Sequence, residues 1–453
     1  MTTLGHGQRS SGTIGRRIFL KVGGAVGGVV AATGLEGIFA AGRAPAFAQP
    51  TKLHLLQWVD FIPEGDVELR RQAAEYSRQT KTDVTVETIT ANDLQARITA
   101  AIQSGTGPDI IQLLHNWPHL YQNALVDLSD LCEWKARDQG GFYPQMEAAA
   151  RAGTRWLALP YGMVCGLITY RKSWFGEVGA TQPPRTLEEY RKLGVALKKK
   201  DKPLGQTLGH TFGDAPGWTY PMVWGFGGAE TDSTGKKVVL NSKGTIESVK
   251  WMVGFWKDAC DESALAWDDT NNNRAFHANV ISATLNGASI YIFAKRNPEK
   301  VKDETGQPMW RDISHFPIPD GPLGRTPSYQ GGFSHALMKY SRNQPAAKEF
   351  LKWLHSKEQF GKWFEIESGY SIGATTLWEN HPIWEKVDDA LKPFRTAARG
   401  SRMFGYAGPP SAKAAEVYTK YIITDMYAKA VQGMTAEDAV KWADGELKKI
   451  YEA

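Results

Sequence analysis

Hydrophobic and polar positions follow two different periods along the chain after residue 50. Residues 52–59 form an apolar run and residues 83–89 alternate apolar with polar side chains, as strands do. Residues 66–79 and 92–104 repeat apolar positions every three or four residues, as helices do, and a short apolar run follows at 109–114. This β-α-β-α-β order predicts a parallel sheet with helices on both faces.

The remainder of the chain continues this mixture of strands and helices. Further strands are predicted at 156–160, 166–170, 280–285 and 335–340, a small hairpin at 231–240, and a strand mixed with turns at 313–323. Further helices are predicted at 186–200, 244–258, 345–354 and 358–366, and the chain beyond 411 is expected to be helical. Thr186 and Glu189 form a capping box, and Asn92 is a candidate N-cap.

The first 48 residues have the features of an export signal. Arg16 and Arg17 precede a hydrophobic pair, as in a twin-arginine motif, and an apolar, glycine-rich run follows at 22–32. That run is too short and too weakly hydrophobic to span a bilayer. The Ala-Phe-Ala sequence that ends at Ala48 suits a signal peptidase, so we expect cleavage before Gln49. A basic tail and an uncleaved anchor are the alternatives.

Composition and charge narrow the classes of function. The chain has 453 residues, of which 42% are hydrophobic and 22% are charged, so it has room for two or three ordinary globular domains. The formal net charge is +5, but residues 1–48 carry +4 of it. No basic stripe remains to neutralise phosphates, which argues against a nucleic-acid partner. No other stretch is long and apolar enough to span a membrane, so we expect a soluble mature protein.

Signatures of catalytic, cofactor and metal sites are missing from the sequence. It contains no HExxH, GxSxG, P-loop or EF-hand motif, and we expect no cofactor and no metal. His115 and His119 are four residues apart, but Pro118 interrupts the helix that would align them on one ion. The acidic and amide residues at 268–273 predict a turn with helix caps rather than a calcium loop. The three cysteines have no CxxC spacing; buried thiols are the simpler interpretation, and a disulfide is the alternative.

Aromatic and planar polar residues gather at the ends of predicted strands and at glycine-flanked turns, where an open α/β sheet holds its ligand. Sugars need this mixture, because their C–H faces stack on aromatic rings and their hydroxyls need donors and acceptors of fixed geometry. Paired glycines also let a backbone N–H approach a ligand closely. The residues that fit this description are Trp58, Asn116, Trp117, Tyr161, Trp218, Asn286, Tyr329, Gly331, Gly332 and Tyr370.

Several motifs together resemble one protein family. They are SGTGPDII at 104–111, LPYG at 159–162, LITYRK at 167–172, ATLNG at 283–287, FPIPDG at 316–321 and AAKEFLKWL at 346–354, followed by ESGY at 367–370. The chain thereby resembles the extracellular solute-binding proteins of ABC importers, in the group that includes the maltose- and glycerol-3-phosphate-binding proteins. Arg171 stands where that family usually has Asn.

The resemblance implies a fold, lobe boundaries and a ligand site. The implied fold is an α/β, two-lobed periplasmic-binding-protein fold (Venus flytrap, type II) with a central sheet in each lobe and a hinge that closes over the ligand. The implied segments are a twin-arginine signal peptide at 1–48, lobe 1 at 49–163 and 331–366, and lobe 2 at 164–330 and 367–453. Ligand contacts are implied for Asn116 or Trp117, Tyr161, Trp218, Asn286, Gly331, Gly332 and Tyr370. Trp58, Tyr329 and Tyr406 are added for their aromatic character, and Arg402 as the cation that an anionic ligand would need.

We therefore expect a monomeric periplasmic protein that captures a solute and delivers it to an ABC permease in the inner membrane, without turnover. A mono- or oligosaccharide or a sugar derivative is the expected solute. An exported glycosidase or lyase is the alternative, but it would need two carboxylates about 5–10 Å apart, and only Asp60, Glu64 and Asp109 lie near predicted strand ends. An exported cofactor enzyme is a third alternative, for which no motif is present.

Overall fold

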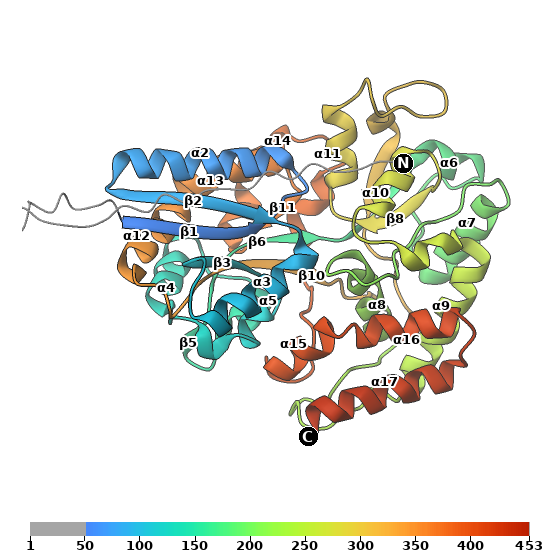
Figure 1. Ribbon diagram of the computed structural model, residues 1–453. Coiled ribbons are helices and arrows are strands. Elements are labelled where there is room, and N and C mark those ends of the chain that lie inside the picture. The colour runs from blue at the N-terminus through green and yellow to red at the C-terminus, as the bar shows by residue number, and fades with distance from the viewer. Residues whose placement is uncertain (1–50, 453) are drawn as a thin grey trace, which may run out of the picture. The chain divides into compact units, whose positions relative to one another are not determined.

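The computed structural model describes residues 51–452, so the predicted signal peptide and its cleavage site lie outside the described residues. The described chain is built on two main β-sheets, one of six strands and one of three (Figure 1). We call the part built on the six-stranded sheet the larger lobe, and the part built on the three-stranded sheet the smaller lobe. No helix within residues 51–452 has the length and apolar character needed to cross a membrane.

The larger sheet is mixed, with strand order β11-β6-β10-β3-β1-β2. β1 runs parallel to both β2 and β3, which confirms the parallel arrangement predicted for the first three strands, whereas β6, β10 and β11 join antiparallel. β3 is buried at every position, as expected for a strand covered on both faces. The strands are β1 (Thr51–Trp58), β2 (Thr82–Ile89), β3 (Ile110–Leu114), β6 (Leu159–Cys165), β10 (Gln330–Leu337) and β11 (Ser371–Gly373).

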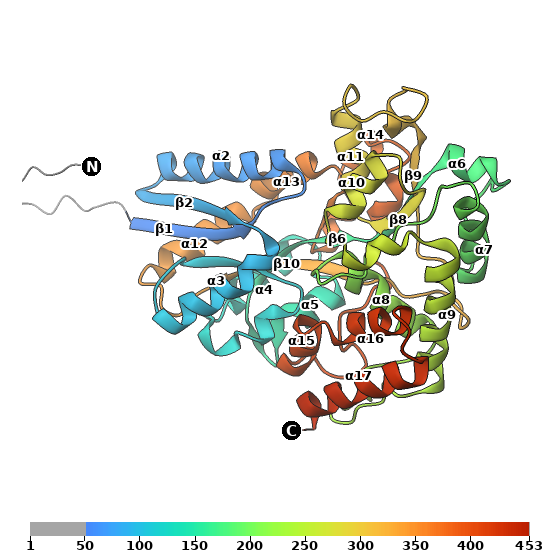
Figure 2. The ribbon, with the colours of Figure 1, turned by 45° about the vertical axis from the view of Figure 1, so that its right-hand side comes forward.

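Helices cover both faces of this sheet. Figures 1 and 2 show α2 and α13 together over one face and α3 over the other. α3 begins earlier than predicted: its N-cap is Thr90, whose backbone is extended, and not Asn92. The helices of this part of the chain are α2 (Pro63–Gln79), α3 (Ala91–Ser104), α4 (Ser129–Asp138), α5 (Pro144–Ala150), α12 (Gln344–Leu354) and α13 (Lys357–Glu367).

The smaller sheet has the order β8-β7-β9, and β7 pairs antiparallel with both neighbours. The predicted capping box of Thr186 and Glu189 is confirmed at the start of α7, whereas the predicted hairpin at 231–240 is reduced to one bridge between Thr231 and Val238. The strands are β7 (Leu167–Arg171), β8 (Ala283–Asn286) and β9 (Ile313–Phe316). The remaining helices are α6 (Lys172–Glu177), α7 (Leu187–Lys198), α8 (Asp214–Gly225), α9 (Lys243–Ala259), α10 (Asn271–His277), α11 (Ser289–Arg296), α14 (Ile383–Lys386), α15 (Ala412–Thr419), α16 (Ile422–Val431) and α17 (Ala436–Tyr451).

Short elements complete the structure. A two-stranded sheet joins β4 (Arg151–Ala152) to β5 (Arg155–Trp156). The 3₁₀ helices are η1 (Trp117–His119), η2 (Gln122–Ala124), η3 (Glu262–Ala266), η4 (Met309–Asp312), η5 (Thr376–Asn380) and η6 (Lys392–Thr396). The chain after 411 is helical, as the sequence predicts.

The chain passes between the lobes on adjacent antiparallel strands. β6 in the larger sheet is followed, after Gly166, by β7 in the smaller sheet, and the segment 317–329 leads from β9 back to β10. β6 and β10 lie side by side where they approach the smaller lobe (Figure 2). The residues after 366 were expected in the second lobe, but β11 pairs with β6 and extends the larger sheet to residue 373.

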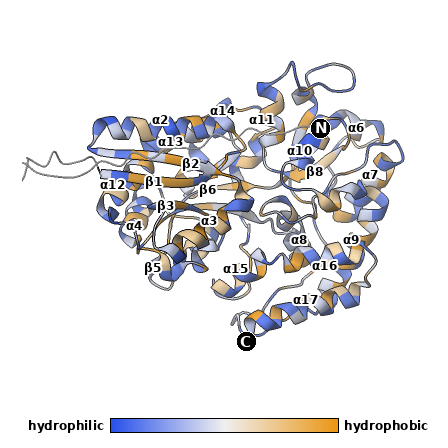
Figure 3. Ribbon diagram, in the orientation of Figure 1, coloured by the Kyte–Doolittle hydropathy of each residue, from blue (hydrophilic) through white to orange (hydrophobic). Residues whose placement is uncertain are grey.

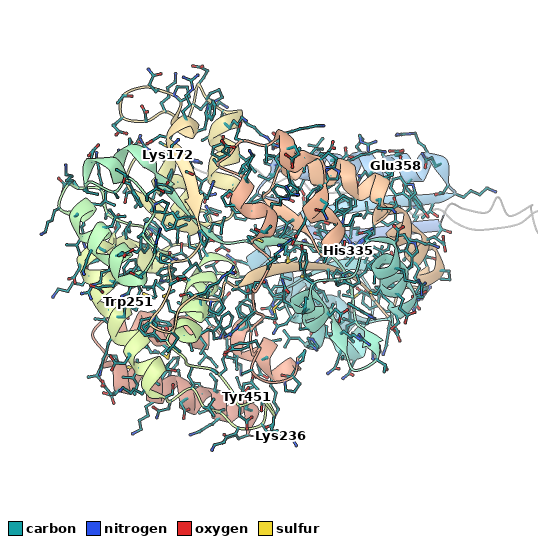
Figure 4. All side chains as sticks on the ribbon, turned by 180° about the vertical axis from the view of Figure 1, so that it is seen from behind. Lys172, Lys236, Trp251, His335, Glu358 and Tyr451 are labelled. Atoms are coloured by element: carbon teal, nitrogen blue, oxygen red, sulfur yellow. The ribbon has the colours of Figure 1, made fainter. Side chains whose placement is uncertain are left out.

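Each lobe has its own apolar interior. Figure 3 shows the strands of the larger sheet as predominantly hydrophobic, between helices of mixed character. Of the residues labelled in Figure 4, His335 lies in the interior of the larger lobe and Trp251 is partly buried in the smaller lobe, whereas Lys236 and Glu358 are exposed. The three cysteines, Cys132, Cys165 and Cys260, are buried free thiols, which confirms the simpler interpretation of the sequence.

A buried arginine stabilises the smaller lobe at the end of β7. The side chain of Arg171 is fully buried at the end of β7. Its guanidinium donates to Asp312 Oδ2 at 2.6 Å, Asn279 Oδ1 at 2.6 Å and Glu304 Oε2 at 2.8 Å. Because the two carboxylates and the amide come from separate segments, one side chain ties these segments to the end of β7, the central strand of the smaller sheet.

Candidate ligand-binding site

A cavity lies between the two lobes and encloses about 570 Å³ of empty space, part of which is open to solvent. We call it the inner cleft. Residues from the larger lobe and from both crossing segments line one side: Trp58, Phe61, His115, Val164, Gly166, Tyr329, Gly331, Phe333 and Tyr370. Residues of the smaller lobe line the other side: Phe212, Gly213, Asp214, Gly217, Asp269, Leu285 and Gly287.

The topology of the two sheets explains why these residues meet. Trp58 is the last residue of β1 and His115 immediately follows β3, so both lie where the two parallel strands end. Leu285 lies near the end of β8, and Gly287 follows that strand in the smaller sheet. Strand ends of both lobes therefore face the inner cleft, as expected for a site in an open α/β sheet.

The wall of the inner cleft on the larger lobe is aromatic. The ring centroid of Trp58 lies 4.9 Å from that of Phe333 and 5.9 Å from that of Phe61, and Phe61 lies 6.0 Å from Tyr370. These contacts join the four rings in a row, from Phe333 through Trp58 and Phe61 to Tyr370, and all four line the same cavity. Such a wall can bind the C–H face of a sugar or an organic cation, because the ring faces are apolar and carry partial negative charge.

His115, which follows β3, also lines the larger-lobe side of the inner cleft, and its ring is neutral. Its backbone is left-handed (φ 51°), and its N–H donates to Gly332 O at 2.7 Å. Its imidazole forms a hydrogen bond with the hydroxyl of Tyr329, and burial lowers the pKa of His115 to about 3. Tyr329 stacks on Phe404 with 4.2 Å between ring centroids. This side of the cleft therefore carries no charge at neutral pH.

The smaller lobe presents two adjacent carboxylates to the inner cleft. The backbone N–H of Asp214 donates to Asp269 Oδ1 at 2.8 Å, and Asn272 Nδ2 donates to Asp214 Oδ2 at 2.6 Å. Burial raises the pKa of both carboxyl groups, and the charge of Asp269 adds to the rise at Asp214. The absence of a side chain at Gly213 allows Asp269 to lie this close to the start of α8, because a β-carbon at residue 213 would lie 2.9 Å from Asp269 Oδ2.

A second group of carboxylates lies in the larger lobe behind Trp58. Asp60 accepts a hydrogen bond from Ile62 N at 2.9 Å, and its own N–H lies 3.3 Å from Asp66 Oδ2. Glu367, at the end of α13, is fully buried beside them. Burial, together with the charge of Asp66, raises the pKa of Asp60 to about 7. Within residues 51–452, no group of three or more His, Cys, Asp or Glu side chains has an arrangement that could hold a metal ion.

An outer hollow continues the inner cleft toward solvent. It shares Trp58, Phe61 and Asp269 with the inner cleft, and it contains about 910 Å³ of empty space including open solvent. Its other lining residues are Val59, Asp60, Thr90, Ala91 and Asn92 of the larger lobe and Thr211, Asp268 and Thr270 of the smaller lobe. We call the inner cleft and this hollow together the interlobe cleft.

Four of the residues singled out from the sequence meet in the inner cleft: Trp58, Tyr329, Gly331 and Tyr370. Gly331 lies against His115, since a β-carbon there would stand 3.2 Å from His115 Cε1. Its neighbour Gly332 does not share this position. A β-carbon at Gly332 would point to the opposite face of β10 and meet Met146 Sδ at 3.0 Å.

Three other predicted residues meet in a separate hollow. Asn116, Arg402 and Tyr406 line it together with Gln145, which lies in α5. The guanidinium of Arg402 lies 3.9 Å from the ring centroid of Tyr406. Arg402 was considered as the cation for an anionic ligand, but the structure places it in this hollow and not among the lining residues of the interlobe cleft.

Tyr161 and Trp117 serve the interior of the structure. The hydroxyl of Tyr161 accepts a hydrogen bond from Gln112 Nε2 at 2.6 Å, and its ring stacks on His335 at 4.5 Å between centroids. Trp117 is fully buried, with its ring 5.0 Å from that of Phe212. Trp117 therefore supports a cleft residue from behind.

Trp218 and Asn286 also lie outside the lining of the interlobe cleft. The sequence places Trp218 in a glycine-flanked loop, but it lies within α8 and is fully buried, with Nε1 3.4 Å from Met252 Sδ. Asn286 is buried at the end of β8 and donates a hydrogen bond to Asn273. Its neighbour Gly287 lines the inner cleft instead.

Sequence reasoning missed the residues that the smaller lobe contributes. Phe212 and Asp214 fall between the predicted helix at 186–200 and the predicted hairpin at 231–240, and Asp269 belongs to the segment 268–273, interpreted as a turn with helix caps. The turn is confirmed at Asp268, whose Oδ1 accepts from the N–H groups of Thr270 and Asn271. The N-cap of α10 is Thr270, which makes no side-chain cap bond. The available signal was a pair of acidic residues, Asp268-Asp269, of which only one is needed for the turn.

The fold and the cleft define a class of protein. Two α/β lobes, joined by adjacent strands and enclosing an aromatic cleft, are the architecture of binding proteins that close over a solute by a hinge. Comparison with known proteins agrees with this class. The profile of the family described as bacterial extracellular solute-binding protein matches residues 71–390.

Similar proteins match over most of their length. A Deinococcus radiodurans protein described as a probable ABC transporter-binding protein is 20% identical over 90% of this chain and 97% of its own length. The diacetylchitobiose-binding protein DasA of Streptomyces coelicolor is 25% identical over 83% of this chain and 85% of its own length.

Solved structures share the fold. Maltose-bound MalE3 of T. maritima has a TM-score of 0.73 at 20% identity, covering 88% of this chain and 99% of that one. A sugar transporter of Arthrobacter chlorophenolicus with bound laminaribiose has a TM-score of 0.72 at 17% identity, with coverage of 88% and 99%. The chain belongs to the bacterial extracellular solute-binding protein family, and it is the solute-binding protein of an ABC transporter.

Proposed function

We propose that this protein captures a carbohydrate or a sugar derivative in the interlobe cleft and delivers it to an ABC permease. The observation that carries the proposal is the pairing of an aromatic wall with hydrogen-bonding carboxylates across one cavity. Sugars are recognised by this combination of stacking and directed hydrogen bonds. The maltose, laminaribiose and diacetylchitobiose named for similar proteins are in accord with it.

The proposed contacts combine predicted and newly found residues. Of the predicted residues, we propose contacts for Trp58, Tyr329, Gly331 and Tyr370. From the structure we add Phe61, Asp214 and Asp269. We also propose that the larger lobe comprises residues 51–165 and 330–373, so that the last passage to the smaller lobe comes after β11. Closure would then bring Asp214 and Asp269 onto a ligand that rests on Trp58.

The proposed location is the periplasm, reached as a monomer by the twin-arginine route. The arginine pair Arg16 and Arg17 and the small residues that end at Ala48 support this, although they lie outside the described residues. Replacing both arginines with Lys should abolish export, and mass spectrometry of exported wild-type protein should show a chain that begins at Gln49. Normal export of the double variant would contradict the proposed route.

The test of function measures binding, closure and the fate of the solute. Purified protein from residue 49 onward is screened by thermal shift against a panel of neutral, acidic and amino sugars, since a ligand at a hundred times its Kd adds about 2.7 kcal/mol to the free energy of unfolding. For each hit, small-angle scattering should show a smaller radius of gyration. The solute should be recovered intact, because a transport protein binds without turnover. A cleaved or isomerised solute, formed in proportion to protein concentration, would favour the exported-enzyme alternative.

A further inference from the structure

The charged groups that line the interlobe cleft are all acidic. Asp214 and Asp269 line its inner part, and Asp60, Asp268 and again Asp269 line its outer part. No Lys or Arg is among the described residues that line either part. His115, which also lines the inner part, is neutral because burial lowers its pKa to about 3. The cleft therefore gathers carboxyl groups, in a chain whose described part has nearly equal numbers of acidic and basic residues. Burial raises the pKa of Asp214, Asp269 and Asp60, so a cation bound beside them would favour their ionised form.

The protein itself does not neutralise the two inner carboxylates. The partners of Asp214 and Asp269 are backbone N–H groups, the side chain of Thr211 and the amide of Asn272, and no ion pair involves either residue within the described part of the chain. The buried Arg171 cluster shows the contrast, because there Asp312 and Glu304 are both paired with a guanidinium. Two desolvated carboxyl groups that lie side by side without a cation favour the binding of a positively charged ligand.

Asp60 adds a third carboxyl group from the opposite lobe. It lines the outer part of the cleft next to Trp58 and Phe61, and the nearest groups behind it, Asp66 and Glu367, are acidic too. Asp66 Oδ1 is buried and has no hydrogen-bond partner. Carboxyl groups thus line the cleft on both lobes, Asp60 on one side and Asp214, Asp268 and Asp269 on the other. Closure brings them closer together, and a cation between them would offset the repulsion of their ionised forms.

The aromatic wall also favours a positively charged ligand. Trp58 and Phe61 border both the inner and the outer parts of the cleft, as does Asp269 on the smaller lobe. An ammonium group placed between these rings and that carboxylate would gain cation–π attraction on one side and charge-assisted hydrogen bonds on the other. A phosphate, sulfate or carboxylate would meet carboxyl groups here and no Lys or Arg among the described lining residues, since Arg402 lies in a separate hollow.

We propose that the ligand is a polyhydroxylated compound with a positively charged amino group, an amino sugar or aminated polyol, whose ammonium lies between Asp269 and Asp214 of the smaller lobe and Trp58 and Asp60 of the larger lobe. This inference rests on the proposed function and narrows its substrate class. The hydroxyl groups of the ligand meet the remaining polar groups of the cleft. The ammonium supplies the charge that the cleft lacks.

A matched pair of disaccharides tests the inference. The glucosamine disaccharide carries two free amines, and N,N′-diacetylchitobiose has the same skeleton with both amines masked as neutral amides. Calorimetry at pH 6.5 and low salt should show the free amine binding at least tenfold more tightly, with an affinity that falls as salt is added. Asp269→Asn should reduce the preference for the amine at least tenfold while leaving the fold unchanged by circular dichroism.

A second cleft variant and a surface control complete the test. Asp60→Asn removes a carboxylate from the opposite lobe and should also reduce the preference, so the test does not depend on whether Asp269→Asn folds. Glu358→Gln removes the same charge from an exposed position on the larger lobe (Figure 4) and should leave both affinities unchanged.

Each other outcome counts against one of the two proposals. Equal or tighter binding of the acetylated disaccharide, or of a neutral or anionic sugar from the screening panel, would overturn the inference and leave the proposed function standing. Failure of both disaccharides to bind would also overturn it. Failure of every sugar and amino sugar to bind and to reduce the radius of gyration would overturn the proposed function itself.

Discussion

Tyr370, next to β11 of the larger sheet, lies directly against Gly287 of the smaller lobe. A β-carbon at Gly287 would stand 3.1 Å from Tyr370 Cε2 and 2.9 Å from Val164 Cγ1. Gly287 follows β8, whereas Val164 lies on β6, the strand by which the chain leaves the larger lobe. The absence of a side chain at residue 287 therefore permits the approach of the two lobes at the inner cleft.

Gly287→Val should weaken closure without unfolding either lobe. The β-carbon added at residue 287 would lie too close to Tyr370 and Val164 for an ordinary van der Waals contact, so these neighbours would have to shift. We expect ligand affinity to fall at least tenfold, a cost of about 1–3 kcal/mol, which is typical of overpacking. Calorimetry gives the affinity, and small-angle scattering should show a smaller decrease in the radius of gyration on binding. Unchanged affinity and closure would contradict this role of Gly287.

Trp58 and Trp218 should respond in opposite ways to truncation. Trp58 lines the cleft, so Trp58→Ala should cost about 1–3 kcal/mol of ligand binding through lost aromatic contact. Trp218 is fully buried in α8, so Trp218→Ala should cost about 3–5 kcal/mol in the free energy of unfolding. Calorimetry and urea denaturation separate the two effects. A folded Trp218→Ala variant with lost binding and unchanged stability would reverse this assignment.

The first elements of the larger lobe are the part of the fold that the sequence predicts best. β1, α2, β2, α3 and β3 each carry a clear period of apolar positions, because helices and strands there bury one face or both. α8 was misjudged for a physical reason. Every residue from Ala215 to Gly225 is buried, so the helix has no polar face, and Gly217 and Pro221 lower its intrinsic propensity.

The sequence predicts part of the candidate site on the larger lobe and the crossing segments, but none of the residues that the smaller lobe contributes. Trp58, Tyr329 and Tyr370 are aromatic residues at the ends of strands or crossings, and that local signal is visible in a sequence. The pairing of Asp214 with Asp269 is not, because these residues are 55 positions apart and meet where the start of α8 lies against the turn before α10. Arg402 was predicted from its residue type alone, as a cation for an anionic ligand, but it lies in a separate hollow.

Arg171 should be essential for the stability of the smaller lobe. Its guanidinium is fully buried and bonded to Asp312, Glu304 and Asn279. Arg171→Met would remove the guanidinium from these partners and leave the two carboxylates to the donors of Ser173 and Trp174. Breaking one side of a buried ion pair costs about 3–5 kcal/mol, and the exposure of Glu304 places the expected loss near the lower end. Thermal and urea denaturation should both show the loss. Arg171→Lys, which keeps the charge but not the fork of donors, should recover only part of it, and full recovery would argue against a geometric role.

Asp60→Asn should change the pH dependence of stability in a defined direction. Burial and the neighbouring Asp66 raise the pKa of Asp60 from 3.8 to about 7, so the native state holds a proton that the unfolded chain has released. The stability that this proton confers is complete below about pH 4 and is lost as the pH rises through about 7. Glu367 and Asp66, whose pKa values are also raised, face Asp60, and Arg296 lies near enough to Glu367 to oppose part of its rise.

The Asn side chain carries no charge at any pH and keeps an oxygen that can accept from Ile62 N. The variant should therefore be more stable than the wild type by about 2 kcal/mol at pH 8, and the difference should shrink toward zero at pH 4. Denaturation in urea at pH 4, 6 and 8 measures this difference in the absence of ligand. Glu358→Gln, on the surface of the same lobe, serves as the control, and its stability should follow the wild type at every pH. A difference between Asp60→Asn and wild type that is constant with pH would show that Asp60 is ionised in the folded protein throughout this range.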